Sequence, residues 1–567
     1  MLVKQGVVQA LGLGGLICAS ACLAQVKDLP DPSPEIRRQD LRLQQLRREL
    51  EFQPVVRLGE TTEVKAARLV EEMPCRDIAV VAFDGPADLE PELQRSLGGE
   101  KSDDSPIGRC LGVQGIAILM DRARNALIAK GYVTSRVEAP PQDLTTGHLR
   151  LEVVFGRIAA IDRVSESGRV LNLRPLVPSE VLNLRDIEQS LENLRRNPSV
   201  QAEFELRPAV ATDATDIVLK VQQGRPLRLN TSLDDSGSSV TGKLIAQGTV
   251  SWDSPLGLSD LVYFSASQDA GQRQSGPRGN DSQTLHYSVP WGYWTGGFTA
   301  THSHNRQTVV GAFQSYLYSG QTQSSELQLA RVVHRDASSK TSIQLKGFDR
   351  SSNNFIDDTE VQVQRRRTAG WELSLQHSHD LGPAAGDLQL SFKRGTGAFG
   401  ALRAPEEAFG EGTSRMQVGT AAINLQWPAN WGARLTVTHN LRVQLNRTPL
   451  VPQDRLCLGG RSSVRGFDGQ QVLCGDRGYV SRNEVIWPFY EAWSTYAGLD
   501  FGRVGGRSAA AFPDSFVAGG VLGLRGQPVA FQEGRLNLEV FAGRPFTKPA
   551  FLKTASTSMG FSAGLNF

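Results

Sequence analysis

The sequence predicts a mixed fold, in which two small α/β domains precede a C-terminal antiparallel transmembrane β-barrel of about 16 strands. From Gly224 to the terminal Phe567, runs of alternating apolar and polar residues are separated by Gly, Asp, Asn and Ser. No amphipathic helical pattern interrupts them. At about 20 residues for each strand and its loop, this region is long enough for about 16 strands. The preceding residues 71–223 contain two successive strand–helix–strand–strand patterns, which predict a duplicated module.

Composition is compatible with this fold and excludes little else. Hydrophobic residues make up 40% of the 567 residues, and the mean hydropathy is -0.27, as in a soluble protein. A membrane β-barrel has the same composition because only every second strand residue faces lipid. The formal net charge of +2 argues against a strongly basic nucleic-acid-binding protein.

The N-terminus predicts export. Lys4, an apolar run over residues 7–23 and small residues before Gln25 are typical of a signal peptide, here residues 1–24. The alternative, a membrane-anchor helix, is disfavoured because the run is short and rich in Gly and Ala. Four cysteines remain after cleavage in an oxidising compartment, so we expect two disulfides. The simplest local pairings are Cys75–Cys110 and Cys457–Cys474.

Residues 25–70 are predicted to hold one helix and a linker. Ser33 followed by Pro34 is typical of a helix start, with Ser33 as the N-cap, and predicts a helix over about 34–50. Its narrow apolar stripe has no partner nearby and must dock elsewhere or stay mobile. The stripe consists of Ile36, Leu43, Leu46 and Leu50.

The two predicted modules span residues 71–156 and 157–223. In the first, a strand over residues 77–83 precedes a helix that ends at Gly131, and two strands follow, the second alternating cleanly over residues 148–156. In the second, a strand over residues 158–164 precedes a helix that we expect Asp186 to cap, with Gln189 completing a capping box. The buried face of that helix is predicted to be Ile187, Leu191 and Leu194. Strands over residues 202–208 and 216–221 complete the module.

Within residues 224–567, alternation assigns each side chain to one face of the wall. The last strand is predicted to point Met559, Phe561, Ala563, Leu565 and Phe567 outward, and Gly560, Ser562, Gly564 and Asn566 inward. The preceding one points Leu536, Leu538 and Val540 outward, and Arg535, Asn537 and Glu539 inward. Aromatic residues over 487–493 sit where a membrane-interface girdle would lie. The alternative, one or two soluble β-sandwiches, fits poorly with an inner face made only of small and polar residues.

One inward residue is a candidate functional group. In AGLDFG, residues 497–502, the apolar positions face lipid, so Asp500 points into the lumen between Gly498 and Gly502, which leave room for a loop. A confined carboxylate requires a cation, and Arg465 is the candidate because its guanidinium suits a bidentate pair. The alternative is that Arg465 is one more pore-lining charge. Arg482 and Glu484 share the inward face of a neighbouring strand and are candidates for the same polar network.

These segments together resemble a known family. GRCLGVQGIAILMDRARNALIAKGYVTSRVEAPPQDLTTGHLRLEVVFG and LRDIEQSLENLRRNPSVQAEFELRPA look like its first and second POTRA domains, SSVRGFDG like the tip of its lumenal loop, and GLDFG like the strand motif that the loop contacts. The chain resembles the outer-membrane transporters of two-partner secretion, the ShlB/FhaC/HecB class of the POTRA-plus-barrel superfamily. The resemblance covers the whole mature chain.

The resemblance implies a site and an activity. The lumenal motif is Val464, Arg465, Gly466 and Phe467, within a loop over about 455–478, and Arg465 pairs with Asp500. The helix over 34–50 matches a helix that plugs the barrel in this family. The Cys75–Cys110 pair matches a family disulfide, whereas Cys457–Cys474 rests on local spacing alone and would fasten the base of the loop.

The implied partner is a secreted exoprotein of the haemolysin or adhesin type. Its N-terminal secretion domain would bind the POTRA domains in the periplasm, and it would leave through an outer-membrane pore. The terminal Phe567 is expected to serve as a membrane-insertion signal for the barrel-assembly machinery, and outer-membrane lipid would surround the barrel.

Two other functions remain open: an assembly insertase of the same superfamily and, less well supported, a passive porin. The sequence contains no HExxH or GxSxG motif, so we expect no catalytic residue, cofactor or metal. The pairs His302/His304 and His377/His379 could share a strand face, but no Cys or carboxylate motif accompanies them. Nucleic acid is not an expected partner.

Overall fold

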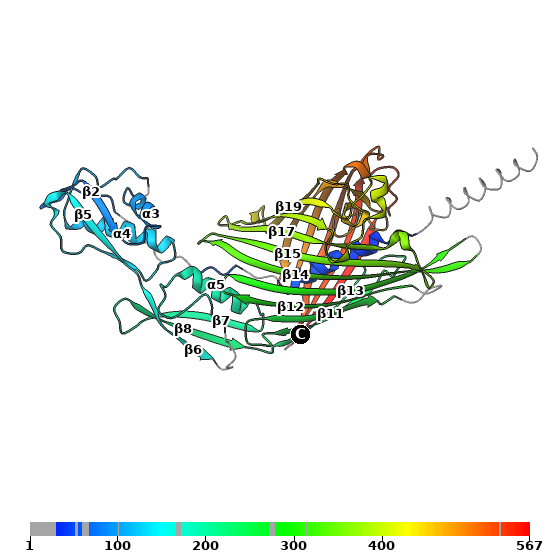
Figure 1. The fold of residues 1–567 in the computed structure, drawn as a ribbon, viewed down its shortest axis with the longest axis horizontal. Helices are drawn as coiled ribbons and strands as arrows, with labels where there is room; N and C mark the ends of the chain where they lie inside the picture. Colours follow the sequence, from blue (N-terminus) through cyan, green and yellow to red (C-terminus); the bar gives the residue numbers. More distant parts are fainter. Residues whose placement is uncertain are drawn as a thin grey trace, which may run out of the picture.

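The computed structural model describes residues 30–51, 55–58, 67–99, 101–165, 172–271, 278–311, 314–531 and 534–567. The predicted signal peptide, residues 1–24, lies outside these ranges. Two α/β domains extend from one end of a large β-barrel, and the N-terminal helix lies inside the barrel (Figure 1).

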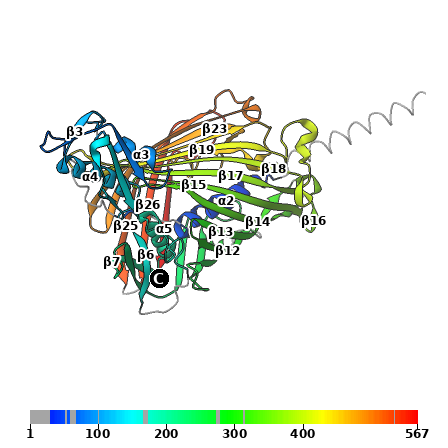
Figure 2. The same cartoon turned by 60° about the vertical axis from the view of Figure 1, so that its left-hand side comes forward.

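Helix α2, Ser33–Leu50, runs along the barrel interior (Figure 2). It begins one residue earlier than predicted, with Pro32 in the N-cap position and no side-chain cap, so the assignment of Ser33 as N-cap is wrong. Instead, the Asp31 carboxylate accepts a hydrogen bond from the Ser33 backbone N–H (2.9 Å). No helix in the described part of the chain is long and apolar enough to span a membrane.

The first α/β domain has a three-stranded sheet in the order β2-β5-β4, with β2 parallel to β5 and α4 packed on it. A separate β1–β3 pair is joined by the Cys75–Cys110 disulfide. The predicted single strand over residues 77–83 is two strands, and helix α3 was not predicted because its seven residues are too few to show a period. The elements are β1 Arg76–Ile78, β2 Val80–Asp84, α3 Glu90–Ser96, β3 Arg109–Leu111, α4 Val113–Ala129, β4 Arg136–Glu138 and β5 His148–Val154.

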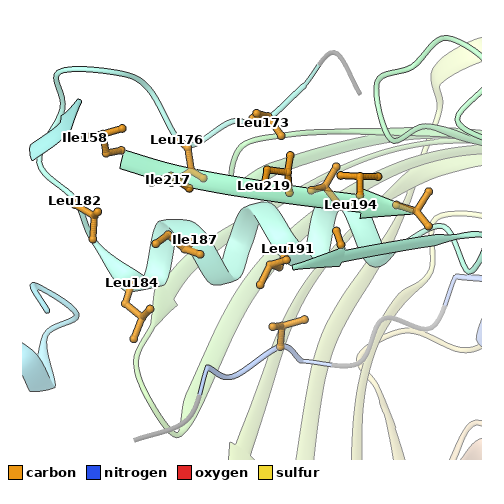
Figure 3. Close-up of a cluster of buried hydrophobic side chains, with 14 residues drawn as sticks. Ile158, Leu173, Leu176, Leu182, Leu184, Ile187, Leu191, Leu194, Ile217 and Leu219 are labelled. Atoms are coloured by element: carbon orange, nitrogen blue, oxygen red, sulfur yellow. The ribbon is translucent and has the colours of Figure 1, made fainter. Parts of the chain in front are cut away.

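The second α/β domain repeats this topology. Its sheet has the order β6-β8-β7, with β6 parallel to β8, so in both domains the last strand lies between the first and the second. The predicted cap is wrong: Asn183, not Asp186, caps α5, and its side chain accepts from the Arg185 N–H. The predicted face Ile187, Leu191 and Leu194 is buried in the core (Figure 3). The elements are β6 Arg157–Ser165, α5 Leu184–Arg195, β7 Val200–Pro208 and β8 Ala214–Gln223.

The described remainder of the chain forms a closed antiparallel barrel of 16 strands, in agreement with the predicted number. The short β16 extends only one hairpin, and β27 pairs with β9 to close the wall. The strands are β9 Leu227–Asp234, β10 Ile245–Asp253, β11 Leu261–Asp269, β12 Gly279–Trp291, β13 Trp294–Val310, β14 Ser315–Arg335, β15 Ser339–Ile356, β17 Arg366–Asp380, β18 Ala385–Thr396, β19 Gln417–Asn430, β20 Arg434–Asn446, β23 Arg477–Tyr490, β24 Trp493–Gly505, β25 Phe516–Phe531, β26 Gly534–Thr547 and β27 Ser558–Asn566.

The wall has the predicted alternation. Met559, Val540 and Leu499 are exposed on the outer surface, whereas Asp500 is completely buried. Large aromatic residues gather near the short turns at the barrel end that faces the α/β domains, as a membrane-interface girdle requires. They include Trp291, Trp294, Trp431, Trp487, Phe489 and Tyr490, all exposed.

The second α/β domain is fastened to that end of the barrel. The Asn193 side-chain amide donates to the Gly292 carbonyl (2.9 Å), and the Tyr293 hydroxyl donates to the Asp186 carboxylate (2.6 Å). The Asn197 amide reaches the Asp260 carbonyl (3.2 Å). Helix α5 therefore lies across the barrel mouth, where it positions both α/β domains.

The core of the second domain gives a direct stability test. We expect Leu191→Ala to lower its free energy of unfolding by about 2–5 kcal/mol, because a fully buried leucine is lost and a cavity remains. Pulse proteolysis of the full-length protein in urea measures the change. The fully exposed Val210 supplies the control, and Val210→Ala should change the value by less than about 0.5 kcal/mol. Equal effects of the two substitutions would contradict the assigned core.

Candidate functional site: a lumenal loop and a helix inside the barrel

The predicted loop, residues 455–478, folds into the lumen between β20 and β23. Its base is a two-stranded ribbon of β21, Leu456–Leu458, and β22, Leu473–Gly475. Cys457 and Cys474 face each other in this ribbon and form a disulfide, with their Cα atoms 4.1 Å apart. The bond closes the loop where it leaves the wall.

Two apolar residues of the loop tip anchor it to the wall. Val464 and Phe467 are buried in a cluster contributed by the loop, by strands β23 to β25 and by the connections β24–β25 and β26–β27. The other members of the cluster are Leu456, Leu458, Leu473, Val480, Val504, Ala509, Val517 and Leu552. Val464 and Phe467 flank Arg465 and Gly466 in the sequence. Their burial therefore fixes the backbone position of Arg465.

Arg465 lies between two carboxylates of the wall. Asp500 accepts from the Arg465 Nε (2.7 Å) and Nη2 (2.9 Å), and from its backbone N–H (3.0 Å). The Arg465 Nη1 donates to Glu484. All three side chains are at least nine-tenths buried. A bidentate, charge-assisted pair of this kind fixes orientation as well as position, which a single point charge does not.

Glycines bring the loop backbone against the wall. A Cβ at Gly498 would lie 2.6 Å from the Arg465 Nη2, and one at Gly519 would lie 2.3 Å from the Arg465 carbonyl oxygen. Gly466 has φ +103°, a conformation that L side chains rarely adopt. The predicted Gly502 also has no room for a side chain, since its Cβ would lie 2.9 Å from Leu458 Cδ1.

The polar network is larger than the sequence indicated. Glu484 joins it as expected, but Arg482 lies at its edge, with its Nε 3.9 Å from the Asp500 carboxylate. Arg525 was missed: it donates to Glu484 (2.5 Å) and to Glu539 (2.9 Å) and stacks on the Tyr496 ring at 3.9 Å. Alternation had placed Glu539 on the inner face, but no sequence signal paired it with Arg525.

Helix α2 occupies the lumen and contacts the opposite wall. Its N-terminal half reaches Asn280 through Glu35 (3.2 Å) and Arg350 through Asp40 (2.6 Å). At its C-terminal end, Arg47 pairs with Glu326 (2.7 Å). Its apolar stripe packs Leu46 and Leu50 against Leu261 and Tyr263 near the barrel mouth. The stripe without a local partner therefore docks on β11.

The helix also contacts the lumenal loop and its base. The Arg38 guanidinium donates to the Gly469 carbonyl (3.3 Å), and Arg37 donates to the Pro452 carbonyl (2.7 Å). A cavity of about 2980 Å³ remains in the lumen, lined by α2, by the lumenal loop and by strands β9, β10, β14, β15, β17 to β20 and β23 to β27. Helix and loop together therefore fill only part of the lumen.

The histidine pairs lie apart from this site. His377 and His379 stack on each other at 5.9 Å, and His377 contacts the Thr341 hydroxyl (2.9 Å). His304 lies 3.5 Å from Asp281. The described residues contain no group of three or more His, Cys, Asp or Glu side chains that could hold a metal ion.

A closed barrel with an outer apolar surface, an internal loop, an internal helix and two α/β domains at its mouth defines an outer-membrane protein translocator. Comparison with models of known protein families identifies one family. The haemolysin secretion/activation protein ShlB/FhaC/HecB model matches residues 213–526, a ShlB-type POTRA model matches residues 103–156, and a second POTRA model matches residues 157–208. The chain belongs to this haemolysin secretion/activation family and is an outer-membrane transporter of two-partner secretion.

Individual relatives are similar in sequence to most of this chain. The outer membrane transporter CdiB-2 of Burkholderia pseudomallei is 31% identical over 88% of both chains. The hemolysin transporter protein ShlB of Serratia marcescens is 27% identical over 78% of both. The solved structure of CdiB from Acinetobacter baumannii matches with a TM-score of 0.81 and 28% identity, over 95% of this chain and 100% of that one. The two α/β domains are named POTRA 1 and POTRA 2 below.

The buried guanidinium gives a prediction for the loop. Arg465→Lys keeps the charge but loses the bidentate geometry, so we expect loop docking to weaken by about 2 kcal/mol. That loss corresponds to about thirtyfold faster amide hydrogen exchange over residues 456–475 in the purified protein. Arg482→Lys, in the same lumen but only at the edge of the network, is the control and should leave this exchange unchanged. Equal protection in wild type and Arg465→Lys would show that the ion pair does not hold the loop.

Proposed function

We propose that this protein exports one partner exoprotein of the haemolysin or adhesin type, which arrives unfolded in the periplasm. The POTRA domains bind the N-terminal secretion domain of the exoprotein, and the barrel lumen is its route out. The observation that carries the proposal is the position of α2. Helix α2 fills part of the lumen of a barrel whose internal loop is held by buried ion pairs.

The two lumenal elements differ in how they are held. The loop is joined to the wall covalently at both ends, closed by a disulfide, and held by the buried Arg465 pair. Helix α2 has one covalent connection to the rest of the described chain, and its exposed Gln44, Gln45, Arg48 and Glu49 face the cavity. Leaving the lumen exposes little apolar surface, because its stripe is narrow. The helix therefore moves during transport, and the loop stays.

Capture of an unfolded chain needs an open strand edge. Strand β7 is one of the two edge strands of the POTRA 2 sheet, since the order is β6-β8-β7. An extended segment of the exoprotein adds to such an edge through main-chain hydrogen bonds, which give affinity without requiring one sequence. Folding of the exoprotein outside the cell makes its passage one-way. No catalytic step and no cofactor are assigned to the chain.

The same proposal covers how the transporter reaches its membrane. Phe567 is half-exposed, and its backbone exchanges hydrogen bonds with Leu229 at the closing seam of the barrel (2.9 and 3.2 Å). We assign it the role of an insertion signal for the barrel-assembly machinery, and outer-membrane lipid covers the apolar surface of the barrel. The insertase and porin alternatives lose support because neither requires a helix seated in the lumen.

Co-expression with the large exoprotein encoded nearest to this chain tests the function. Wild type should release exoprotein into the culture medium, and Arg465→Ala should reduce that release by at least about tenfold while the barrel stays folded. The reason is that Arg465→Ala leaves the buried Asp500 without its bidentate cation, a loss of about 3–5 kcal/mol from loop docking, although Glu484 keeps its pair with Arg525. Arg482→Ala is the matched control and should secrete normally. Exoprotein retained in the periplasm with wild type, despite a folded barrel, would contradict the export function for this pair.

A further inference from the structure

A short piece of the predicted linker is bound between POTRA 2 and the barrel. Residues 55–58, which belong to no helix or strand, run past helix α5 and past the turn between β14 and β15. Val56 is buried in the hydrophobic core of POTRA 2, and Leu58 packs against the same core. The sequence predicted only a linker here, so this attachment was not predicted.

Two carboxylates of α5 bind the backbone of this segment. The Glu192 Oε1 accepts from the Val56 N–H (2.9 Å), and the Glu188 Oε1 accepts from the Leu58 N–H (3.0 Å). The spacings match. Four residues along a helix rise about 6 Å, and two residues along an extended chain cover about 6.6 Å. An i,i+4 pair of carboxylates on a helix thus fits alternate N–H groups of a strand.

The barrel supplies the opposing charge. Arg335, at the end of β14, donates to the Val56 carbonyl (2.7 Å), to Glu192 (2.9 Å) and to Glu188 (3.2 Å). Lys340, at the start of β15, also pairs with Glu192. Both carboxylates are completely buried, and the Arg335 side chain is 3% exposed.

The carboxylate of Glu192 stays ionised in this setting. Burial opposes its ionisation, but the hydrogen bond from Arg335 and the charge of Lys340 outweigh burial and lower its pKa. A second barrel contact holds the next linker residue, since Arg57 pairs with Asp380 and donates to the Ser338 carbonyl (2.8 Å). The bound segment therefore contacts POTRA 2 and the barrel at once, through charged groups that are costly to separate one at a time.

We propose that residues 55–58, Glu188, Glu192 and Arg335 form a latch that holds the C-terminal end of α2 at the barrel mouth until POTRA 2 and the barrel separate at this point. This inference rests on the proposed export function, because it concerns how the route for the exoprotein is cleared. The three side chains are positioning residues: they lie outside the lumen and act through the linker on the helix.

Chain length supports the confinement. Helix α2 ends at Leu50, and five residues link Glu51 to Val56, so the end of the helix stays within about 18 Å of Val56. The helix has 18 residues and is about 27 Å long. With the latch closed, its C-terminal end therefore remains at the periplasmic mouth, in the path of an entering chain.

Opening the latch increases the distance that the end of α2 can move from its point of attachment. The next described attachment is at Ala67, whose carbonyl accepts from Arg122 of POTRA 1 (3.1 Å). The 16 residues from Glu51 to Ala67 span up to about 55 Å, about twice the length of the helix. Because the latch carboxylates belong to POTRA 2 and Arg335 to the barrel, an exoprotein that moves POTRA 2 away from the barrel would open the latch and free the plug in one step.

A crosslink tests the confinement. In full-length Arg57→Cys/Asp380→Cys protein, a short, reducible reagent with two thiol-reactive groups joins the linker to the barrel. We expect the crosslinked protein to show at least about tenfold fewer full openings in planar lipid bilayers, and reduction to restore them. Inserting 12 Gly/Ser residues between Glu51 and Val55 should restore the openings with the crosslink intact, because it adds about 40 Å of reach. Openings that are unaffected by the crosslink, or lost despite the insertion, would overturn the proposal.

A substitution that weakens the latch should have the opposite effect and increase channel opening. Val56→Asp places a charge in the POTRA 2 core beside Glu192 and should raise the fraction of time open by at least about tenfold. Val70→Asp is the matched control, with the same substitution in the same linker at an exposed residue, and should behave as wild type. Unchanged gating in Val56→Asp, or the same rise in Val70→Asp, would refute the latch.

The bilayer readout needs no exoprotein, so it separates the two proposals. If wild type exports no exoprotein but the crosslink and insertion act as expected, the latch stands and the assigned function fails. If export occurs at the wild-type rate with the crosslink in place, the latch fails and the function stands.

Discussion

The interaction on which the lumen depends is the ion pair of Arg465 with Asp500, extended by Glu484. A guanidinium in a buried position is stable only when its charge and donors are satisfied, and here two carboxylates and a fixed wall satisfy them. Because the wall strands supply both carboxylates, the loop tip has one position. The remaining space in the barrel is then shaped by a fixed element on one side and by α2 on the other.

The two elements inside the lumen differ in how strongly they are attached to the barrel wall. The loop is disulfide-closed and buried, whereas α2 contacts the wall through a few ion pairs, several of them part-exposed, and two leucines near the mouth. A channel for an unfolded protein needs both properties: a wall that keeps its shape and a plug that leaves. The contact of α5 with the barrel turns places POTRA 2 beside the end of α2, so the substrate capture and plug release that we propose share one place.

Much of the site could be predicted because strand alternation fixes which way a side chain points. Because Leu499 must face lipid, Asp500 must face the lumen. Arg465 of the VRGF loop was the cation predicted to pair with the Asp500 carboxylate. Glu484 followed from the same rule. Arg525 did not, because alternation gives the face of a strand but not the distance between strands that are not adjacent in sequence.

The linker and the helix caps show where local pattern fails. Val56 belongs to the core of POTRA 2, yet a run as short as Val55–Val56 has no period from which burial could be inferred. Asp186 and Gln189 matched a capping box, but the helix starts at Leu184, where Asn183 supplies the cap. In both cases a contact between distant parts of the chain, or a competing side chain two or three residues away, decides the outcome.

We propose that α2 must leave the lumen for export. Gln39 of the helix accepts a hydrogen bond from the Ser303 hydroxyl of β13, so Gln39→Cys and Ser303→Cys can be joined by a short reducible crosslinker. Exoprotein release into the medium should stop when the crosslink forms and resume on reduction, while either single cysteine variant secretes throughout. Continued release with the helix crosslinked to the wall would contradict the account, because the exoprotein would then pass beside a plug that never moved.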